Sequence, residues 1–134
     1  MQDVAVLRAG GAPVVATPHG YYLERARDGA VRGVLAVRHG RRDTALELNT
    51  LVDLGLEVLD VTVEHPIYGE LRGLLHLRSR ADVRRFVRRL HDSGAGLLSE
   101  VTGGLHLHTV AAPSRALIAR AKDDLRRRGL LVEG

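Results

Sequence analysis

Apolar positions follow two spacings along most of the chain, one typical of buried strands and the other of amphipathic helices. Short apolar runs predict four strands, at residues 31–39, 56–65, 71–78 and 105–111. Helical spacing predicts three helices, from Asp43 or Thr44 to about Leu54, after Ser79, and from Pro113 to about Arg128. This order of elements, β-α-β-β-α-β-α, is typical of a four-stranded antiparallel sheet covered on one face by helices. We therefore expect an α/β fold of the α+β type, a two-layer sandwich.

The helix predicted after Ser79 divides most clearly into two faces. Its apolar residues recur at intervals of three and four, at Val83, Phe86, Val87 and Leu90. The opposite face carries four arginines, Arg84, Arg85, Arg88 and Arg89. A solvated surface is the plainer interpretation of these arginines, and we assign no site to them.

The first thirty residues follow a different pattern. Residues 2–9 predict a short helix that ends at the pair Gly10-Gly11. Strand-like segments follow at 13–17 and 21–25, and the Pro18-His19-Gly20 between them is typical of a hairpin turn. We therefore expect a short N-terminal helix followed by a β-hairpin.

Composition narrows the class of protein without identifying its chemistry. The 134 residues suffice for one domain, and no apolar run approaches the roughly 18 residues of a membrane span. The absence of cysteine excludes disulfides and cysteine-ligated zinc, and it suits a cytoplasmic protein. Nearly all of the positive charge is arginine, with Lys122 as the single lysine, and only 3% of the residues are aromatic. The low aromatic content argues against a stacking platform for single-stranded nucleic acid.

Two of the seven histidines, His106 and His108, lie two positions apart in the last predicted strand. Side chains two apart on a strand point to the same face, with their backbones about 7 Å apart. That spacing suits two ligands of one transition metal. Because the chain has no cysteine, the other ligands must be nitrogen or oxygen donors. Without further context, two structural or exposed histidines remain the alternative.

Three longer motifs supply that context. They are RHGRRDTALEL at residues 38–48, VEHPIYGE at 63–70 and GGLHLHT at 103–109. Together they resemble the 3H domain, which is named for its three histidines and forms the regulatory half of niacin-responsive repressors of NAD biosynthesis. The resemblance runs from about Val31 to the C-terminus and assigns residues 31–134 to a ligand- and metal-binding regulatory domain.

The resemblance implies one divalent transition metal, held by His39, Glu47, His106 and His108. Zinc, nickel and iron(II) all suit three imidazoles and a carboxylate, and the order of affinities does not choose among them. The family fold resembles the histidine phosphocarrier proteins, with strand order 1-4-2-3. That order brings the ends of the first and last predicted strands together at one edge, where His39 and His106 lie.

The same resemblance implies a small anionic effector. A divalent ion with one carboxylate carries a net charge of about +1, which favours an anion such as nicotinate. We expect His65, Tyr68 and Glu70, in the loop after the second predicted strand, to bind this ligand. Two alternatives stay open: His65 as a fifth metal ligand or a group behind the ligands, and Tyr68 and Glu70 as residues that only shape the turn.

Residues 2–9 and 16–23 resemble the recognition helix and the wing of the family's winged helix-turn-helix. The resemblance assigns residues 1–27 to a partial DNA-binding domain, in which we expect Gln2, Arg8 and His19 to contact DNA. The helices that precede the recognition helix in the family have no counterpart in this sequence, and a winged helix without them has little core. We therefore expect residues 1–134 alone to bind DNA weakly. A wrong start codon, a truncated sequence and a true loss all stay open.

The implied function is that of a transcription repressor, not an enzyme. It would sense nicotinic acid or a related pyridine and act in the cytoplasm, as a homodimer on operator DNA, on genes of NAD biosynthesis or niacin uptake. One alternative is a stand-alone metal-dependent module that binds a small molecule but not DNA. Another is a metal hydrolase with a metal-bound water, although no general base lies at a suitable spacing.

Overall fold

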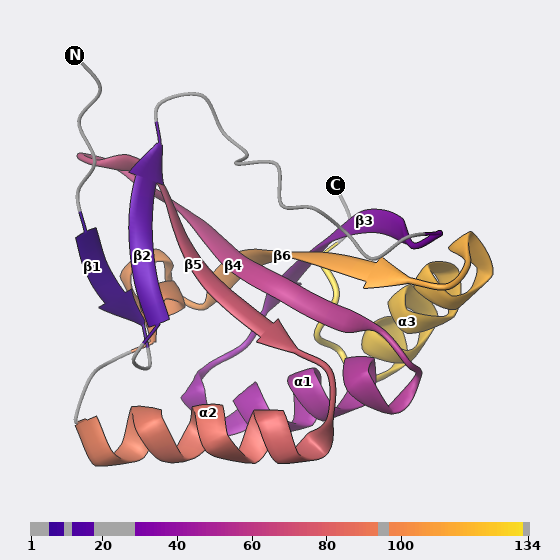
Figure 1. Cartoon of the computed structure of the whole chain (residues 1–134). Helices are drawn as coiled ribbons and strands as arrows, with labels where there is room; N and C mark the ends of the chain where they lie inside the picture. The colour runs from indigo at the N-terminus through magenta and orange to yellow at the C-terminus, as the bar shows by residue number, and fades with distance from the viewer. Residues whose placement is uncertain (1–5, 10–11, 18–28, 94–96, 133–134) are drawn as a thin grey trace.

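The computed structural model describes residues 6–9, 12–17, 29–93 and 97–132, arranged as Figure 1 shows. In chain order the elements are β1 (Val6–Ala9), β2 (Ala12–Thr17), β3 (Val31–Arg38), the 3₁₀ turn η1 (Arg41–Asp43), α1 (Thr44–Asp53), β4 (Glu57–His65), β5 (Gly69–Leu77), α2 (Arg80–Ser93), the 3₁₀ turn η2 (Leu98–Thr102), β6 (Leu105–Ala112) and α3 (Arg115–Arg127). Every strand and helix predicted after residue 30 is present within two residues of its expected bounds.

The described strands form one sheet with the order β1-β2-β5-β4-β6-β3, and all of its neighbours are antiparallel. The four predicted strands occupy the order β3-β6-β4-β5, which confirms the expected order 1-4-2-3. β3 and β6 pair along their whole length, from Val31 opposite Ala112 to Arg38 opposite Leu105. The end of β3 therefore lies beside the beginning of β6.

The three helices cover one face of the sheet, and the main apolar core lies between the two layers (Figure 1). Leu48 and Leu51 of α1, Phe86 of α2 and Leu125 of α3 all enter this core. The predicted two-layer α+β sandwich is thus confirmed. On β6, Val110 and Ala112 are core residues. Strand alternation places His106 and His108 on the same face, at the polar end of the core.

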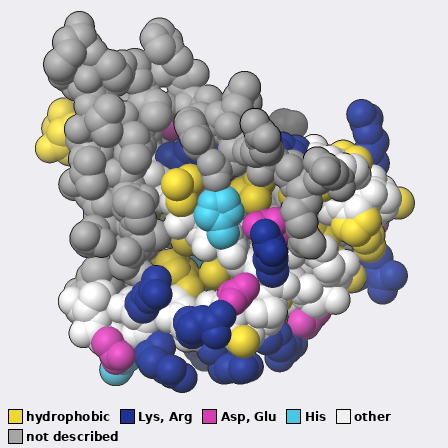
Figure 2. Space-filling model, viewed as in Figure 1, with side chains coloured by type: hydrophobic (Ala, Val, Ile, Leu, Met, Phe, Trp, Pro, Cys, Tyr) yellow, Lys and Arg dark blue, Asp and Glu magenta, His cyan; other side chains and the backbone are white. Residues whose placement is uncertain are grey.

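The arginine face of α2 is on the surface, as predicted. Figure 2 shows Lys and Arg side chains gathered over α2 at the bottom of the view. The four arginines of this face are all exposed: Arg84, Arg85, Arg88 and Arg89. None of the helices in the described ranges combines the length and the apolar character that a membrane span requires.

The predicted N-terminal helix is wrong over the residues that the structure describes. Residues 6–9 form β1, which pairs with β2 from Val6 opposite Val15 to Ala9 opposite Ala12. An isolated helix of about eight residues is unstable because its nucleation is costly, whereas a strand gains ladder hydrogen bonds immediately. A Gly-Gly pair is also a typical sequence for a two-residue hairpin connection.

The expected wing is described only in part. Its first strand is present as β2, which also pairs with β5, with Val15 opposite Arg72. The second predicted strand at 21–25 and its turn lie outside the described residues, as do Gln2 and His19. Arg8 lies in β1, not in a helix. DNA contacts by these three residues stay a prediction.

Ser79 caps the N-terminus of α2. Its Oγ accepts a hydrogen bond from the Asp82 backbone N–H at 3.1 Å, and the Asp82 carboxylate accepts one from the Arg78 N–H at 2.9 Å. We expect Ser79→Ala to lower the free energy of unfolding by about 1 kcal/mol, because an N–H at the helix start loses its acceptor. Urea denaturation measures this. Ser79→Asn, which keeps an acceptor, should match the wild type, and an equally stable Ser79→Ala protein would contradict the capping role.

Candidate metal centre

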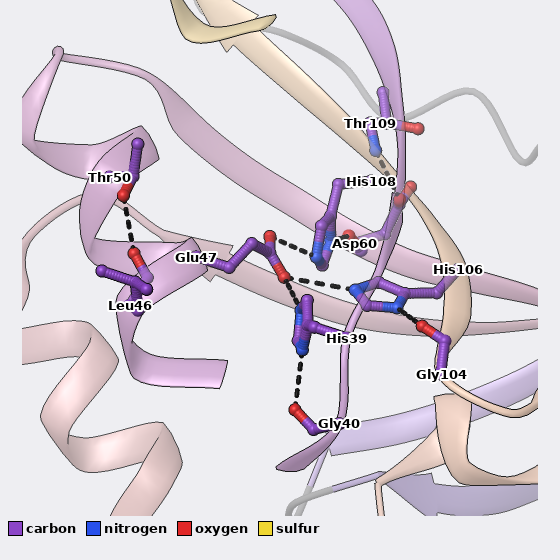
Figure 3. Close-up of polar contacts among 10 residues, drawn as sticks. All are labelled: His39, Gly40, Leu46, Glu47, Thr50, Asp60, Gly104, His106, His108 and Thr109. Atoms are coloured by element: carbon purple, nitrogen blue, oxygen red, sulfur yellow. Dashed lines mark hydrogen bonds and ion pairs between the residues drawn. The ribbon is translucent and has the colours of Figure 1, made fainter. Parts of the chain in front are cut away.

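Three histidines and one glutamate converge at the polar end of the core, and they come from three different elements (Figure 3). His39 follows β3, and His106 and His108 lie on β6. Glu47 lies in the first turn of α1 and points toward the sheet. The β3–β6 register, with Val37 opposite His106, brings His39 beside the histidine pair. All four residues predicted as metal ligands therefore lie in one cluster.

The Nε2 atoms of the three imidazoles surround the Glu47 carboxylate. Glu47 Oε1 lies 2.5 Å from His39 Nε2 and 3.2 Å from His106 Nε2. Glu47 Oε2 lies 2.8 Å from His108 Nε2. No more than 4% of any of these side chains is exposed. The cluster is thus a buried polar centre, and among the described residues the three imidazoles are the groups paired with the carboxylate.

The other ring nitrogen of each histidine contacts a backbone carbonyl. His39 Nδ1 lies 2.8 Å from the Gly40 oxygen, and His106 Nδ1 lies 2.9 Å from the Gly104 oxygen. His108 Nδ1 lies 2.6 Å from the Asp60 oxygen. A carbonyl can only accept, so each Nδ1 carries a proton, and each ring in its neutral form presents an Nε2 lone pair to a cation bound beside Glu47. Histidines that bind metals show this same arrangement, in which the second nitrogen donates to a carbonyl or a carboxylate.

The contact between His108 and Glu47 also favours a cation. His108 Nε2 and Glu47 Oε2 are 2.8 Å apart, yet neither atom has a partner with hydrogen-bond geometry in the part of the chain that the structure describes. Buried polar atoms nearly always have a hydrogen-bond partner or a bound ion. Two adjacent buried atoms without such a partner therefore indicate that they share one, such as a cation. One ligand atom from each of His39, Glu47 and His106 lies within 4.8 Å of the others. The donors therefore fit a divalent transition metal that prefers imidazole and carboxylate.

Without a metal, protons take the place of the cation. Burial raises the pKa of Glu47, but the charge of His108 and the contacts of the carboxylate with the three histidines outweigh burial and hold the pKa well below its ordinary value. Burial lowers the pKa of His108, yet the charge of the adjacent Glu47 raises it above the ordinary value. His39 shows the same balance, whereas burial prevails at His106 and lowers its pKa. The metal-free centre therefore favours an ionised Glu47 beside cationic His39 and His108.

A cavity of about 30 Å³ adjoins the cluster. Its apolar wall includes Phe86 and Leu98, and the four cluster residues and Thr44 also line it. Thr44 Oγ1 is buried and has no hydrogen-bond partner among the described residues. The volume is close to that of one water molecule in the liquid, so the cavity has room for one further oxygen donor beside the cluster.

The predicted ligand-binding residues His65, Tyr68 and Glu70 do not line this cavity. They lie at the connection between β4 and β5. His65 Nδ1 accepts hydrogen bonds from the backbone N–H groups of Ile67 and Tyr68, at 3.1 and 3.2 Å, and its ring packs against the Tyr68 ring with centroids 4.8 Å apart. These contacts of His65 and Tyr68 shape the turn, which was the alternative interpretation of Tyr68. A role in ligand binding stays a prediction.

Two further residues, Gly104 and Asp60, support the centre. Neither of them was assigned a role from the sequence. The Gly104 carbonyl accepts from His39 N as well as from His106, and a Cβ at Gly104 would lie 2.5 Å from the His39 oxygen. The Gly103-Gly104 pair in the third motif was the available signal. The Asp60 carbonyl left no such signal, because its role depends on the pairing of β4 with β6.

Comparisons with known proteins give one family match and two similar proteins with names. A family model described as the 3H domain matches residues 32–134. Over 133 residues the chain is 38% identical to a protein of Thermotoga maritima named probable transcription repressor NiaR, covering 99% of this chain and 75% of that protein. Over 136 residues it is 35% identical to the transcription repressor NadR of Bacillus subtilis, covering 99% and 76%. The similarity to these proteins thus includes residues before the 3H match.

Proposed function

This chain belongs to the 3H domain family, and we propose that it represses transcription in response to a small anion bound at a metal in its 3H domain. Both named relatives are transcription repressors, and the chain is a transcription regulator rather than an enzyme. The observation that carries the metal proposal is the buried carboxylate that three Nε2 atoms face while every Nδ1 donates to a carbonyl.

We infer that His39, Glu47, His106 and His108 hold one divalent transition metal, with zinc, nickel and iron as the candidates. The four side chains supply three neutral donors and one negative charge, so the loaded centre carries about +1. A buried net positive charge favours an anionic ligand. Nicotinate, a planar pyridine carboxylate, is the anion that we propose, and operator DNA is the macromolecular partner. A homodimer would match the two half-sites of an operator.

The geometry supports an effector carboxylate more directly than an effector ring. The cavity beside the cluster has room for an oxygen atom but is far smaller than the several hundred Å³ of a typical ligand pocket. A carboxylate oxygen could reach the metal there, with the Thr44 hydroxyl as its neighbour, while the ring requires further space. The segment His65–Glu70, at the same end of the sheet, is our proposed location for the ring.

We expect nicotinate to raise the melting temperature of the metal-loaded protein, because it binds the folded state. Neutral nicotinamide should raise it less, since it lacks the charge that the centre attracts. The shift should shrink after the metal is removed or in His65→Ala. Scanning calorimetry with both ligands measures this. Equal stabilisation with and without metal would exclude the metal from the effector site, and no stabilisation by any pyridine carboxylate would exclude niacin sensing.

We also expect the stabilising effect of the metal to grow as the pH rises. In the metal-free protein the raised pKa values of His39 and His108 stabilise the fold at acidic pH, and this contribution is lost as the pH rises through them. Metal binding needs both imidazoles deprotonated, so its affinity increases over the same range. Melting temperatures of chelated and loaded protein, measured from about pH 5 to about pH 9, should therefore diverge. A constant difference would contradict the shared role of these histidines.

A further inference from the structure

His108 differs from the other two histidines in where its Nδ1 partner comes from. His39 and His106 contact carbonyls within two residues of themselves. The Asp60 carbonyl that accepts from His108 Nδ1 lies on β4, 48 residues away in sequence. The orientation of the His108 ring therefore depends on how β4 is held against β6.

The Asp60 carbonyl is available because β4 carries an extra residue at this point. The pairing matches Val58 with Val110 and Thr62 with Leu107, so β4 advances one residue more than β6 between these pairs. Such a bulge removes a residue from the regular ladder and redirects its backbone groups. Here the redirected carbonyl accepts the Nδ1–H of His108, as Figure 3 shows.

The side chain of Asp60 holds the same stretch of β6. Its Oδ1 accepts a hydrogen bond from the Thr109 backbone N–H at 2.9 Å, directly after His108. Its Oδ2 accepts from Arg72 Nε on β5 at 2.7 Å. The Asp60 and Arg72 side chains are 0% and 3% exposed. Removing one partner of a buried ion pair is strongly unfavourable, because the other group is left without a compensating contact.

We propose that the buried Asp60–Arg72 pair positions His108 for metal binding, an inference that rests on the metal site proposed above. Arg72 holds the Asp60 carboxylate in place through its hydrogen bond to Oδ2. The carboxylate then holds the Thr109 peptide, and the carbonyl of the same residue holds the His108 ring. Asp60 and Arg72 are positioning residues, not ligands. Outer partners of this kind commonly change metal affinity by about 10- to 100-fold.

Cobalt(II) tests this inference, because its visible spectrum reports the coordination geometry as well as binding. The dissociation constant is measured by competition with a chromophoric chelator. We expect Arg72→Met to bind Co²⁺ about 10- to 100-fold more weakly than the wild type and to alter the absorption bands. Thr62→Val is the matched control, since Thr62 lies opposite Arg72, is 1% exposed, and has an Oγ1 without a hydrogen-bond partner. It should keep the wild-type affinity and spectrum.

A second variant covers the case in which Arg72→Met does not fold. Asp60→Asn combined with Arg72→Met removes both buried charges while keeping the Asp60 backbone, and it should still bind Co²⁺ at least about tenfold more weakly. A folded single or double variant with the wild-type affinity and spectrum would overturn the positioning role. Failure of the wild type itself to bind Co²⁺ would instead overturn the metal site on which the inference rests.

Discussion

A chain in which both His106 and His108 are alanine should retain no divalent metal after dialysis. The change removes two of the three imidazoles, and His39 with Glu47 supplies only two ligands, fewer than a stable transition-metal site needs. Elemental analysis of the dialysed protein measures the occupancy, and circular dichroism checks that the fold persists. Full occupancy in this double variant would contradict the assignment of the ligands.

The matched control replaces two histidines that lie elsewhere. His76 on β5 and His91 on α2 are 46% and 88% exposed, and neither belongs to the cluster. Alanine at both positions should leave the metal content unchanged. If this control also loses metal, the loss in the His106 and His108 variant reflects the smaller number of histidines and not the removal of the buried centre.

Glu47→Gln should weaken metal binding by at least about 100-fold, since loss of a direct ligand should exceed the effect of an outer partner. The substitution keeps the shape of the side chain but removes the one negative charge that the three Nε2 atoms face. An uncompensated divalent charge would then be buried among neutral donors, which is unfavourable. Titration with a competing chelator measures the affinity. A change smaller than tenfold would mean that Glu47 is not a ligand.

The same variant makes a prediction about acid stability. Because the pKa of Glu47 is depressed in the folded protein, its carboxylate stabilises the fold above the unfolded pKa, and this stability is lost as the pH falls through the folded value. Metal-free wild type should therefore lose more stability than Glu47→Gln between about pH 5 and about pH 2. Urea denaturation at several pH values compares them. Parallel losses in the two proteins would contradict the ion pairing of Glu47.

The sequence predicted which four residues form this centre, but it did not predict which face of the sheet the helices cover or the strand register around these residues. Strand alternation was enough to place His106 and His108 on one face, and the family motifs added His39 and Glu47. Periodicity could not show that the helices cover this face of the sheet. That cover is the reason why Glu47 is only 1% exposed. Periodicity also could not show the extra residue in β4 that directs the Asp60 carbonyl to His108, because a bulge depends on the register between two distant strands.

The N-terminal segment shows the opposite case. Residues 6–9 were predicted as helix from a short pattern and a resemblance, yet they form β1 at the edge of the sheet. Short segments have little intrinsic preference for helix or strand, so the strands available for pairing decide which structure they adopt. η2 at Leu98–Thr102 was not predicted for a related reason, since five residues are too few to show a helical period.

The metal content of the purified wild-type chain tests the central claim most directly. The protein is stripped with a chelator, incubated separately with Zn²⁺, Ni²⁺ and Fe²⁺, dialysed, and analysed for metal per chain. The buried cluster of His39, Glu47, His106 and His108 predicts one ion per chain for at least one of these metals, together with a higher melting temperature. A chain that retains none of them and melts at the same temperature with and without each metal would contradict the account.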